Sequence, residues 1–181
     1  MKKILLIALG MIMVATGAAM AADSKPIQLS LTPGIAVYDT DTTIGGAAFS
    51  IWGENPQKAF ALGFVNGSKG DSAGFSLGIL FNYAETYKGV QWAPVNYAKK
   101  DLFGWQAGVF NYTDNAMKGL QTGVVNWAGV LTGLQLGVVN YAAKAESGLQ
   151  IGVVNIISQN QWFTNFPGEL APGMIVVNWR F

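Results

Sequence analysis

The 181-residue sequence contains neither cysteine nor histidine. Without cysteine the chain can form no disulfide and can carry no lipid through a cysteine thioether. Without histidine it lacks the base of Ser-His-Asp and Cys-His sites, and without both residues it lacks the usual ligands of zinc. The carboxylates offer no replacement, because Asp39 and Asp41 read as a solvated turn and Glu54, Glu85 and Glu146 stand apart. We therefore expect no enzyme, no catalytic residue, no cofactor and no metal site.

Charge is scarce as well: charged residues make up 12% of the chain, whereas hydrophobic residues make up 51%. A soluble domain of this size normally has a more highly charged surface. Without Lys2 and Lys3, nine basic residues stand against ten acidic ones, so no charge excess favours nucleic acid. No segment beyond the N-terminus has 18 uninterrupted apolar residues, so any contact with lipid would have to be made by strands.

The N-terminus has the pattern of a secretory signal peptide. Lys2 and Lys3 precede an apolar stretch over 4–14, and Ala19-Met20-Ala21 forms a small-x-small cleavage site before Ala22. We expect residues 1–21 to be removed on export. The remaining residues 22–181 have the length of a single domain.

Most of the exported region repeats one motif. The sequence G-L-Q-L-G-V-V-N-Y begins at Gly133; close copies begin at 104, 119 and 148, looser ones at 74 and 89, and a fading one at 59. Leading positions from 74 to 148 are separated by 15, 15, 15, 14 and 15 residues. A fixed period over 59–157 indicates that each repeat is one structural unit packed against the next.

The composition of the repeats favours strands, because Val, Ile, Leu and aromatic residues alternate with glycines that a helix would resist. Turn-forming clusters of hairpin length separate the apolar segments. Segments of nine to eleven tilted residues also match the hydrocarbon layer of a membrane. The sequence thus predicts an all-β fold, an antiparallel transmembrane β-barrel of about ten strands. The expected strands are 27–38, 43–52, 58–66, 73–83, 88–98, 103–112, 118–128, 132–142, 147–157 and 172–181.

The last expected strand, 172–181, carries a separate signal. Ile175, Val177, Trp179 and Phe181 alternate up to the C-terminus, in the pattern by which the barrel-assembly machinery of Gram-negative bacteria recognises its substrates. This predicts a place in the outer membrane, with outer-membrane lipid and that machinery as partners. A structural or narrow-channel role would follow, with no ligand indicated.

The loop before this strand is the longest in the chain and is rich in aromatic residues. Trp162, Phe163 and Phe166 are candidates for an outward apolar contact or for insertion at the membrane interface. A loop that folds over the mouth of the barrel is an equally good interpretation.

Two arguments disagree on which face of each strand lies inside. Strict alternation places Gln135 and Gly137 on one face and Leu136 and Asn140 on the other. Buried glutamines can bond to each other, which favours the Gln face inside. Alignment of the C-terminal strand with the repeats places Trp179 on that same face, although a barrel signal requires it to face lipid.

An alternative fold accounts for the same period. In a β-solenoid each repeat would form one coil and the repeated asparagines would stack in a ladder, giving an exported surface binding module. The barrel and the solenoid both require a fixed repeat, so the period by itself does not separate them.

The motif G-[LVW]-Q-x-[GA]-[VP]-[VF]-N-[YWI], with the terminal V-N-W-R-F, resembles the bacterial surface repeat-containing proteins of the Leptospira type. The resemblance covers 59–181. It implies a place at the outer membrane or cell surface, and because the family has no established activity, it assigns no residue a role.

Overall fold

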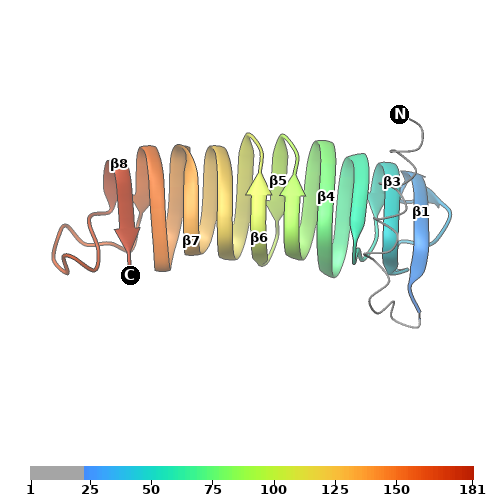
Figure 1. The fold of residues 1–181 in the computed structure, drawn as a ribbon, viewed down its shortest axis with the longest axis horizontal. Coiled ribbons are helices and arrows are strands. Elements are labelled where there is room, and N and C mark those ends of the chain that lie inside the picture. The colour runs from blue at the N-terminus through green and yellow to red at the C-terminus, as the bar shows by residue number, and fades with distance from the viewer. Residues whose placement is uncertain (1–22) are drawn as a thin grey trace, which may run out of the picture.

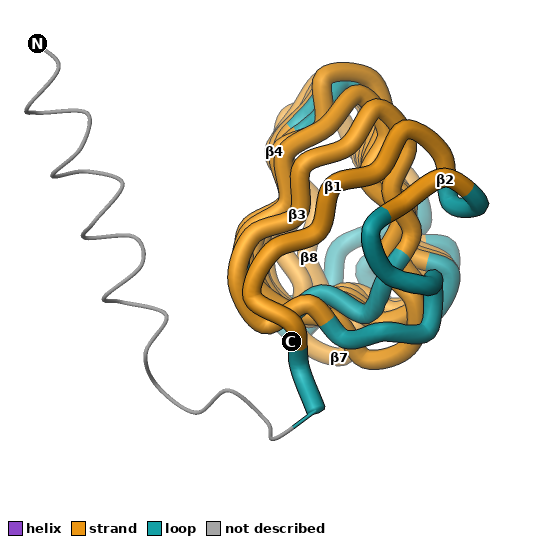
Figure 2. Tube along the Cα trace, turned by 90° about the vertical axis from the view of Figure 1, so that its right-hand side faces the viewer, coloured by secondary structure: helices purple, strands orange, loops and turns teal. Residues whose placement is uncertain are grey.

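The computed structural model describes residues 23–181, which form a parallel β-solenoid of about seven turns. The coils follow one another along the long axis (Figure 1) and lie over one another when viewed along that axis (Figure 2). The predicted signal peptide, 1–21, lies outside the described residues. The strands are β1 (Lys25–Thr32), β2 (Ile35–Ala36), β3 (Ile44–Glu54), β4 (Phe60–Trp92), β5 (Val95–Ala98), β6 (Leu102–Ala107), β7 (Phe110–Ile157) and β8 (Gly173–Arg180).

Neighbouring coils pair in parallel and in the register of the repeat. Gln91 of β4 pairs with Gln106 of β6, which in turn pairs with Gln121 of β7. Asn96 of β5 lies between Asn82 and Asn111 in the same way. Each repeat position therefore forms a column along the solenoid, and below we number the positions of a coil from its leading glycine.

The predicted antiparallel barrel is wrong, and the solenoid alternative is the fold. The polar clusters expected to be hairpin turns are bends after which the chain continues around the same coil. β4 runs without a break through 67–72 and 84–87, and β7 runs through 113–117 and 143–146. Antiparallel pairing joins only β1 to β2 and β7 to β8 among the named strands of the described residues.

Two ladders of amide side chains run through the core. In the Asn ladder each side-chain Nδ2 donates to the Oδ1 of the next coil, as in Asn111 to Asn126 and Asn126 to Asn140, both at 2.8 Å. In the Gln ladder each Nε2 donates to the preceding coil, as in Gln121 to Gln106 at 2.8 Å. The ladders comprise Asn66, Asn82, Asn96, Asn111, Asn126, Asn140 and Asn155, and Gln91, Gln106, Gln121, Gln135 and Gln150.

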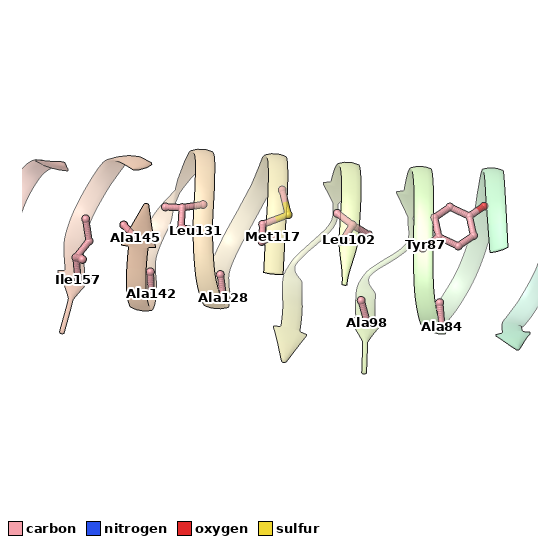
Figure 3. Packing of buried hydrophobic residues seen from close by; sticks show 10 residues of the cluster. All are labelled: Ala84, Tyr87, Ala98, Leu102, Met117, Ala128, Leu131, Ala142, Ala145 and Ile157. Carbon is pink, nitrogen blue, oxygen red and sulfur yellow. The ribbon is translucent and has the colours of Figure 1, made fainter. Parts of the chain in front are cut away.

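Small and medium apolar side chains fill the rest of the core in two further columns (Figure 3). One column lies two residues after each asparagine of the Asn ladder, and the other lies near the end of each coil. All these residues are at most 3% exposed, and they are Ala84, Ala98, Ala128, Ala142 and Ile157 in the first column and Tyr87, Leu102, Met117, Leu131 and Ala145 in the second. The interior is thus narrow, and hydrogen bonds along the axis accompany apolar packing.

The structure resolves which face lies inside. Gln135 and Asn140 are both fully buried, although strict alternation placed them on opposite faces. Alternation fails just after the fifth residue, Gly137, because Val138 and Val139 both lie outside the core, and the chain bends at the equivalent residues 93–94 and 108–109. The two amides therefore enter the core from different walls of the coil. At this bend, a Cβ on Gly137 would lie 2.5 Å from Asn126 Nδ2, and glycine leaves room for the ladder.

Leading glycines stack where only glycine fits. Gly104 and Gly119 have φ angles of 138° and 132°, a region that other residues rarely adopt. A Cβ on Gly119 would lie 2.1 Å from the carbonyl oxygen of Gly104. The repeated glycines therefore have two separate functions, a backbone turn at the first position and space for an amide at the fifth.

Both ends of the solenoid are closed by the chain itself. At the N-terminal end the amide of Gln28 exchanges hydrogen bonds with the backbone of Tyr38, and Asn55 Nδ2 donates to the carbonyls of Asp39 and Thr42. At the C-terminal end β8 covers the last coil, with the fully buried Asn178 in register with Gln150. These caps shield the open strand edges that a solenoid otherwise presents.

A candidate binding surface along the solenoid

The outward side chains divide the solenoid into two zones. At the second, fourth, sixth, seventh and ninth positions, no charged residue occurs anywhere over 59–157. All charged residues of this stretch lie between the tenth position of one coil and the leading residue of the next, on what we call the charged edge. They are Lys69, Asp71, Glu85, Lys88, Lys99, Lys100, Asp101, Asp114, Lys118, Lys144 and Glu146.

We call the uncharged zone the apolar surface. It covers two walls of each coil and the bend between them, because the fourth position precedes the fifth-position bend and the sixth and seventh follow it. Its most exposed members are large hydrophobic residues with 37–62% of their surface exposed: Phe64, Ile79, Leu80, Trp92, Val109, Phe110, Tyr112, Val124, Trp127, Val138, Ile151, Val153 and Val154. Monomeric soluble proteins rarely expose a continuous apolar patch this extensive.

An aromatic column forms the margin of the apolar surface at the ninth position. Tyr112, Trp127 and Tyr141 stack on one another, with ring centroids 5.7 and 3.8 Å apart, and Tyr97 packs against Tyr112 at 5.5 Å with its ring tilted by 43°. Since the rings face one another along the axis, their edges point outward. The column therefore offers a ridge of ring edges and hydroxyls rather than open ring faces for stacking a ligand.

The aromatic column also contacts the charged edge. Tyr97 donates from its hydroxyl to Asp114 Oδ2 at 3.0 Å. Partial burial, followed by this carboxylate, raises the pKa of Tyr97, and a hydrogen bond with Asp114 is the main cause of the raised pKa of Tyr112. Both phenols are therefore neutral at physiological pH.

Aromatic residues border the apolar surface on the other side too. Phe103, the last residue of its coil, has the ammonium groups of Lys88 and Lys118 at 5.7 and 5.9 Å from its ring centre. Next to it, Trp105 donates from Nε1 to Thr122 Oγ1 at 2.8 Å and packs against Trp92, with ring centres 6.3 Å apart. Both margins of the apolar surface thus pair an aromatic ring with a charged or polar group.

The apolar surface continues into a groove at the N-terminal end. Leu29 of β1 pairs with Phe49 of β3, which extends the fourth-position column. The groove, of about 470 Å3, is lined by Leu29, Ser30, Leu31, Ile35, Ala36, Val37, Phe49, Ser50 and Ile51. Its apolar lining continues the surface over the first described strands.

The predicted contact residues Trp162, Phe163 and Phe166 lie together in the loop that projects beyond β8 (Figure 1). All three are exposed, at 68%, 50% and 62%. The loop is held by the buried carboxylate of Glu169, whose Oε1 accepts hydrogen bonds from Gln161 N and Asn165 Nδ2, both at 3.1 Å. The same carboxylate forms an ion pair with Arg180.

Of the residues predicted to be an assembly signal, Ile175, Val177 and Trp179 lie in β8, and Phe181 directly follows it. Ile175 and Phe181 are 74% and 69% exposed, whereas Val177 and Trp179 are partly buried against the last coil. Trp179 donates from Nε1 to the carbonyl of Pro167 at 2.9 Å, which ties β8 to the preceding loop. These four residues and the loop residues 162–166 therefore belong to two segments of the same C-terminal cap.

Within residues 23–181, no cluster of three acidic side chains is arranged to hold a metal ion. In the same part of the chain, no helix has the length and apolar character needed to cross a membrane. Asp41 forms an ion pair with Lys69 at 3.2 Å, and Glu85 forms one with Lys100 at the same distance.

Comparison with known proteins gives no relative: no family model, no curated protein and no solved structure matches the chain. The resemblance to the Leptospira-type repeat proteins therefore stays a prediction.

Sequence reasoning did not find the apolar surface. It assigned these residues to the lipid-facing or interior positions of a barrel. Candidates for a surface contact were sought only in the last loop. The sequence nevertheless contained the signal for this surface, because alignment of the repeats shows that five positions carry no charged residue in any copy.

Proposed function

We propose that this protein is an exported, non-catalytic binding module whose working surface is the apolar surface of the solenoid. One observation carries the proposal: over 59–157, five outward columns contain no charged residue, while eleven charged residues share the remaining edge. Exposed apolar area of this extent is costly in water, so an occupant that covers it gains the hydrophobic free energy of the whole surface.

That the module is non-catalytic rests on the absence of histidine and cysteine from the sequence. That it is exported rests on the N-terminal pattern, and its predicted location at the outer membrane is part of the proposal. Export has a direct test. The mature protein recovered from cells should have the mass of a chain that begins at Ala22, and recovery of the full-length chain would contradict it.

The binding proposal can be tested in cells, because the chain has no cysteine to interfere with single-cysteine labelling. Val124→Cys places a thiol in the apolar surface, where the side chain is 45% exposed. Asn115→Cys places a matched thiol on the opposite, charged edge. A membrane-impermeant maleimide applied to cells with an opened outer membrane should label position 115 several-fold faster than position 124.

After purification without the occupant, both thiols should react at similar rates. Equal labelling of the two positions in cells would show that the apolar surface is uncovered there and would contradict the proposed function. Circular dichroism of both variants, compared with the parent chain, establishes that neither substitution changes the fold.

A further inference from the structure

We infer that the occupant of the apolar surface is the interfacial layer of a lipid bilayer, on which the solenoid lies lengthwise with the charged edge toward water. This inference rests on the proposed function, since it names the partner of the same surface. Four features of the structure favour lipid over a folded protein partner.

The first feature is the shape of the apolar surface. Trp92 and Ile151 stand at the fourth position on one wall of the coil, whereas Val154 and Trp127 stand on the next wall beyond the bend. A flat, rigid partner, including a second copy, would cover one wall and leave the other in water. Fluid acyl chains can follow the bend and cover both walls together.

The second feature is the composition of the two margins. Tyrosine and tryptophan gather where hydrocarbon gives way to headgroups, because each has an apolar ring and a polar tip. Tyr97 and Tyr112 occupy one margin next to Asp114, and Trp105 and Phe103 occupy the other. The ammonium groups of Lys88 and Lys118 lie over the ring of Phe103, and long lysine side chains can cover apolar surface while their charged ends stay in water.

The third feature is the backbone. Lipid tolerates exposed strands only when their N–H and C=O groups are paired within the protein. In the walls of this solenoid each coil pairs with its neighbours from β3 to β7, and the unpaired edges are confined to the ends, where the chain forms caps. The walls can therefore enter the interface without leaving unpaired backbone groups.

The fourth feature is the charge balance. The charged edge of the repeats carries six lysines and five carboxylates; Lys100 is paired with Glu85 on this edge, and Lys69 is paired with Asp41 at the N-terminal end. A protein that bound chiefly through anionic headgroups would show a basic excess. Apolar burial should therefore dominate, and binding to zwitterionic vesicles should change little with salt.

Vesicle binding tests the inference with the mature chain. An environment-sensitive fluorophore on Val124→Cys or Val138→Cys should shift to shorter wavelength when phosphatidylcholine vesicles are added, and the same fluorophore on Asn115→Cys should not. The unlabelled chain should float with the vesicles in a density gradient. Its partition should change less than twofold between 50 and 500 mM salt or on adding 30% phosphatidylglycerol.

A pair of charge variants completes the test. Val124→Glu with Val138→Glu puts two carboxylates in the apolar surface and should lower the vesicle partition at least tenfold. The matched control, Asn115→Glu with Lys144→Glu, puts the same groups on the charged edge and should lower it less than twofold. Both variants change exposed side chains, and circular dichroism identifies any variant that has lost the fold.

The outcomes separate the two proposals. Protection of position 124 in cells without flotation would overturn the lipid inference and leave the binding proposal in place; a concentration-dependent dimer in sedimentation would then identify a second copy as the occupant. Vesicle binding that shifts the fluorophore equally at 115 and 124 would also overturn the inference, because the solenoid would have no lipid-facing side.

Discussion

At the scale of single residues, the amide ladders are the feature that distinguishes this core from an ordinary apolar one. Asn amides donate toward the C-terminus and Gln amides toward the N-terminus, so the dipoles of the two ladders oppose each other. Every interior amide both donates and accepts within the column. Its removal therefore leaves a neighbour without a partner in a site that water does not reach.

We predict that Asn126→Ala lowers the free energy of unfolding by about 2–4 kcal/mol. The substitution removes the donor to Asn140 Oδ1 and to the Leu136 carbonyl, at 2.8 and 3.0 Å, and the acceptor used by Asn111. Urea denaturation followed by circular dichroism measures the change.

Two asparagines serve as controls for this prediction. Asn155 ends its ladder and donates only to the carbonyl of Gly152, at 2.9 Å, so Asn155→Ala should cost less than Asn126→Ala. Asn115 is exposed, and Asn115→Ala should change stability by no more than about 0.5 kcal/mol. Equal losses at 115 and 126 would show that the ladder contributes nothing.

Tyr87 is the one ring in the buried column that otherwise holds Leu102, Met117, Leu131 and Ala145. It is fully buried, and its hydroxyl has no hydrogen-bond partner among residues 23–181. Burial raises the pKa of this phenol well above its ordinary value of 10.0, because the ionised form would lose its hydration.

A raised pKa in the folded state has a definite sign for stability. Below pH 10 Tyr87 is neutral in both states and the folded state keeps its full stability; above it, ionisation in the unfolded state alone favours unfolding. Tyr87→Phe removes this contribution, so the variant should lose less stability than the parent between pH 9 and 11. At pH 7 it should be as stable as the parent or up to about 1 kcal/mol more stable.

Unfolding curves of both chains across this pH range measure the difference. Tyr83, Tyr97 and Tyr112 also have raised pKa values, but they are present in both chains and cancel in the comparison. A parallel decline of the two chains with pH would contradict the assignment to Tyr87.

At the scale of the coil, the sequence predicted the period and the strand character, and the structure confirms them; it left open which face lies inside, and the structure buries the glutamines. It did not predict the direction of each wall, because strict alternation fails at a bend. The alternation shifts after Gly137, where Val138 and Val139 both lie outside the core, so that Gln135 and Asn140 are both buried. In the sequence, a glycine at the fifth position is explained equally well by a bend and by the relief of crowding within one straight strand. The sequence alone does not distinguish these two explanations.

The leading glycines set the geometry of the coil, and Gly119→Ala should destabilise the protein by about 3 kcal/mol or more. A Cβ at this position would meet the carbonyl oxygen of Gly104 at 2.1 Å, and the φ angle of 132° strains any other residue. Gly173→Ala is the matched control, since nothing lies within 4 Å of its added Cβ. Thermal unfolding of the two variants measures the contrast, which would be absent if the coil could readjust around residue 119.

At the scale of the whole molecule, barrel and solenoid share the sequence features that were most visible. Both need a regular repeat, strands with one polar face, and few charges on the outer walls. In a barrel these walls meet lipid on all sides, whereas here the charged residues collect along one edge of each coil. What decides the fold is whether successive repeats run parallel or antiparallel, and hydrophobic pattern alone does not report strand direction.

Strand direction leads to a prediction that separates the solenoid from any fold with alternating strands. Deletion of 104–118 removes one whole coil of 15 residues and joins Phe103 to Gly119. Residues of the same repeat position then become neighbours across the junction, with Gln91 next to Gln121 and Leu102 next to Leu131, as the parallel registers on both sides imply. Because solenoid stability is roughly a sum of coil and interface contributions, the shortened chain should fold cooperatively with a lower denaturation midpoint.

Deletion of the eight residues 104–111 is the control, since it removes part of a coil. It joins Phe103 to Tyr112, which puts a tyrosine where the backbone needs a positive φ and sets Asp114 in line with the buried Gln91. A carboxylate without a charge partner in that core costs several kcal/mol, so this shorter deletion should be the more damaging one. Circular dichroism and urea unfolding of both chains provide the measurement. If the eight-residue deletion folded as well as the 15-residue one, the stacking of like positions could not be what holds the coils together.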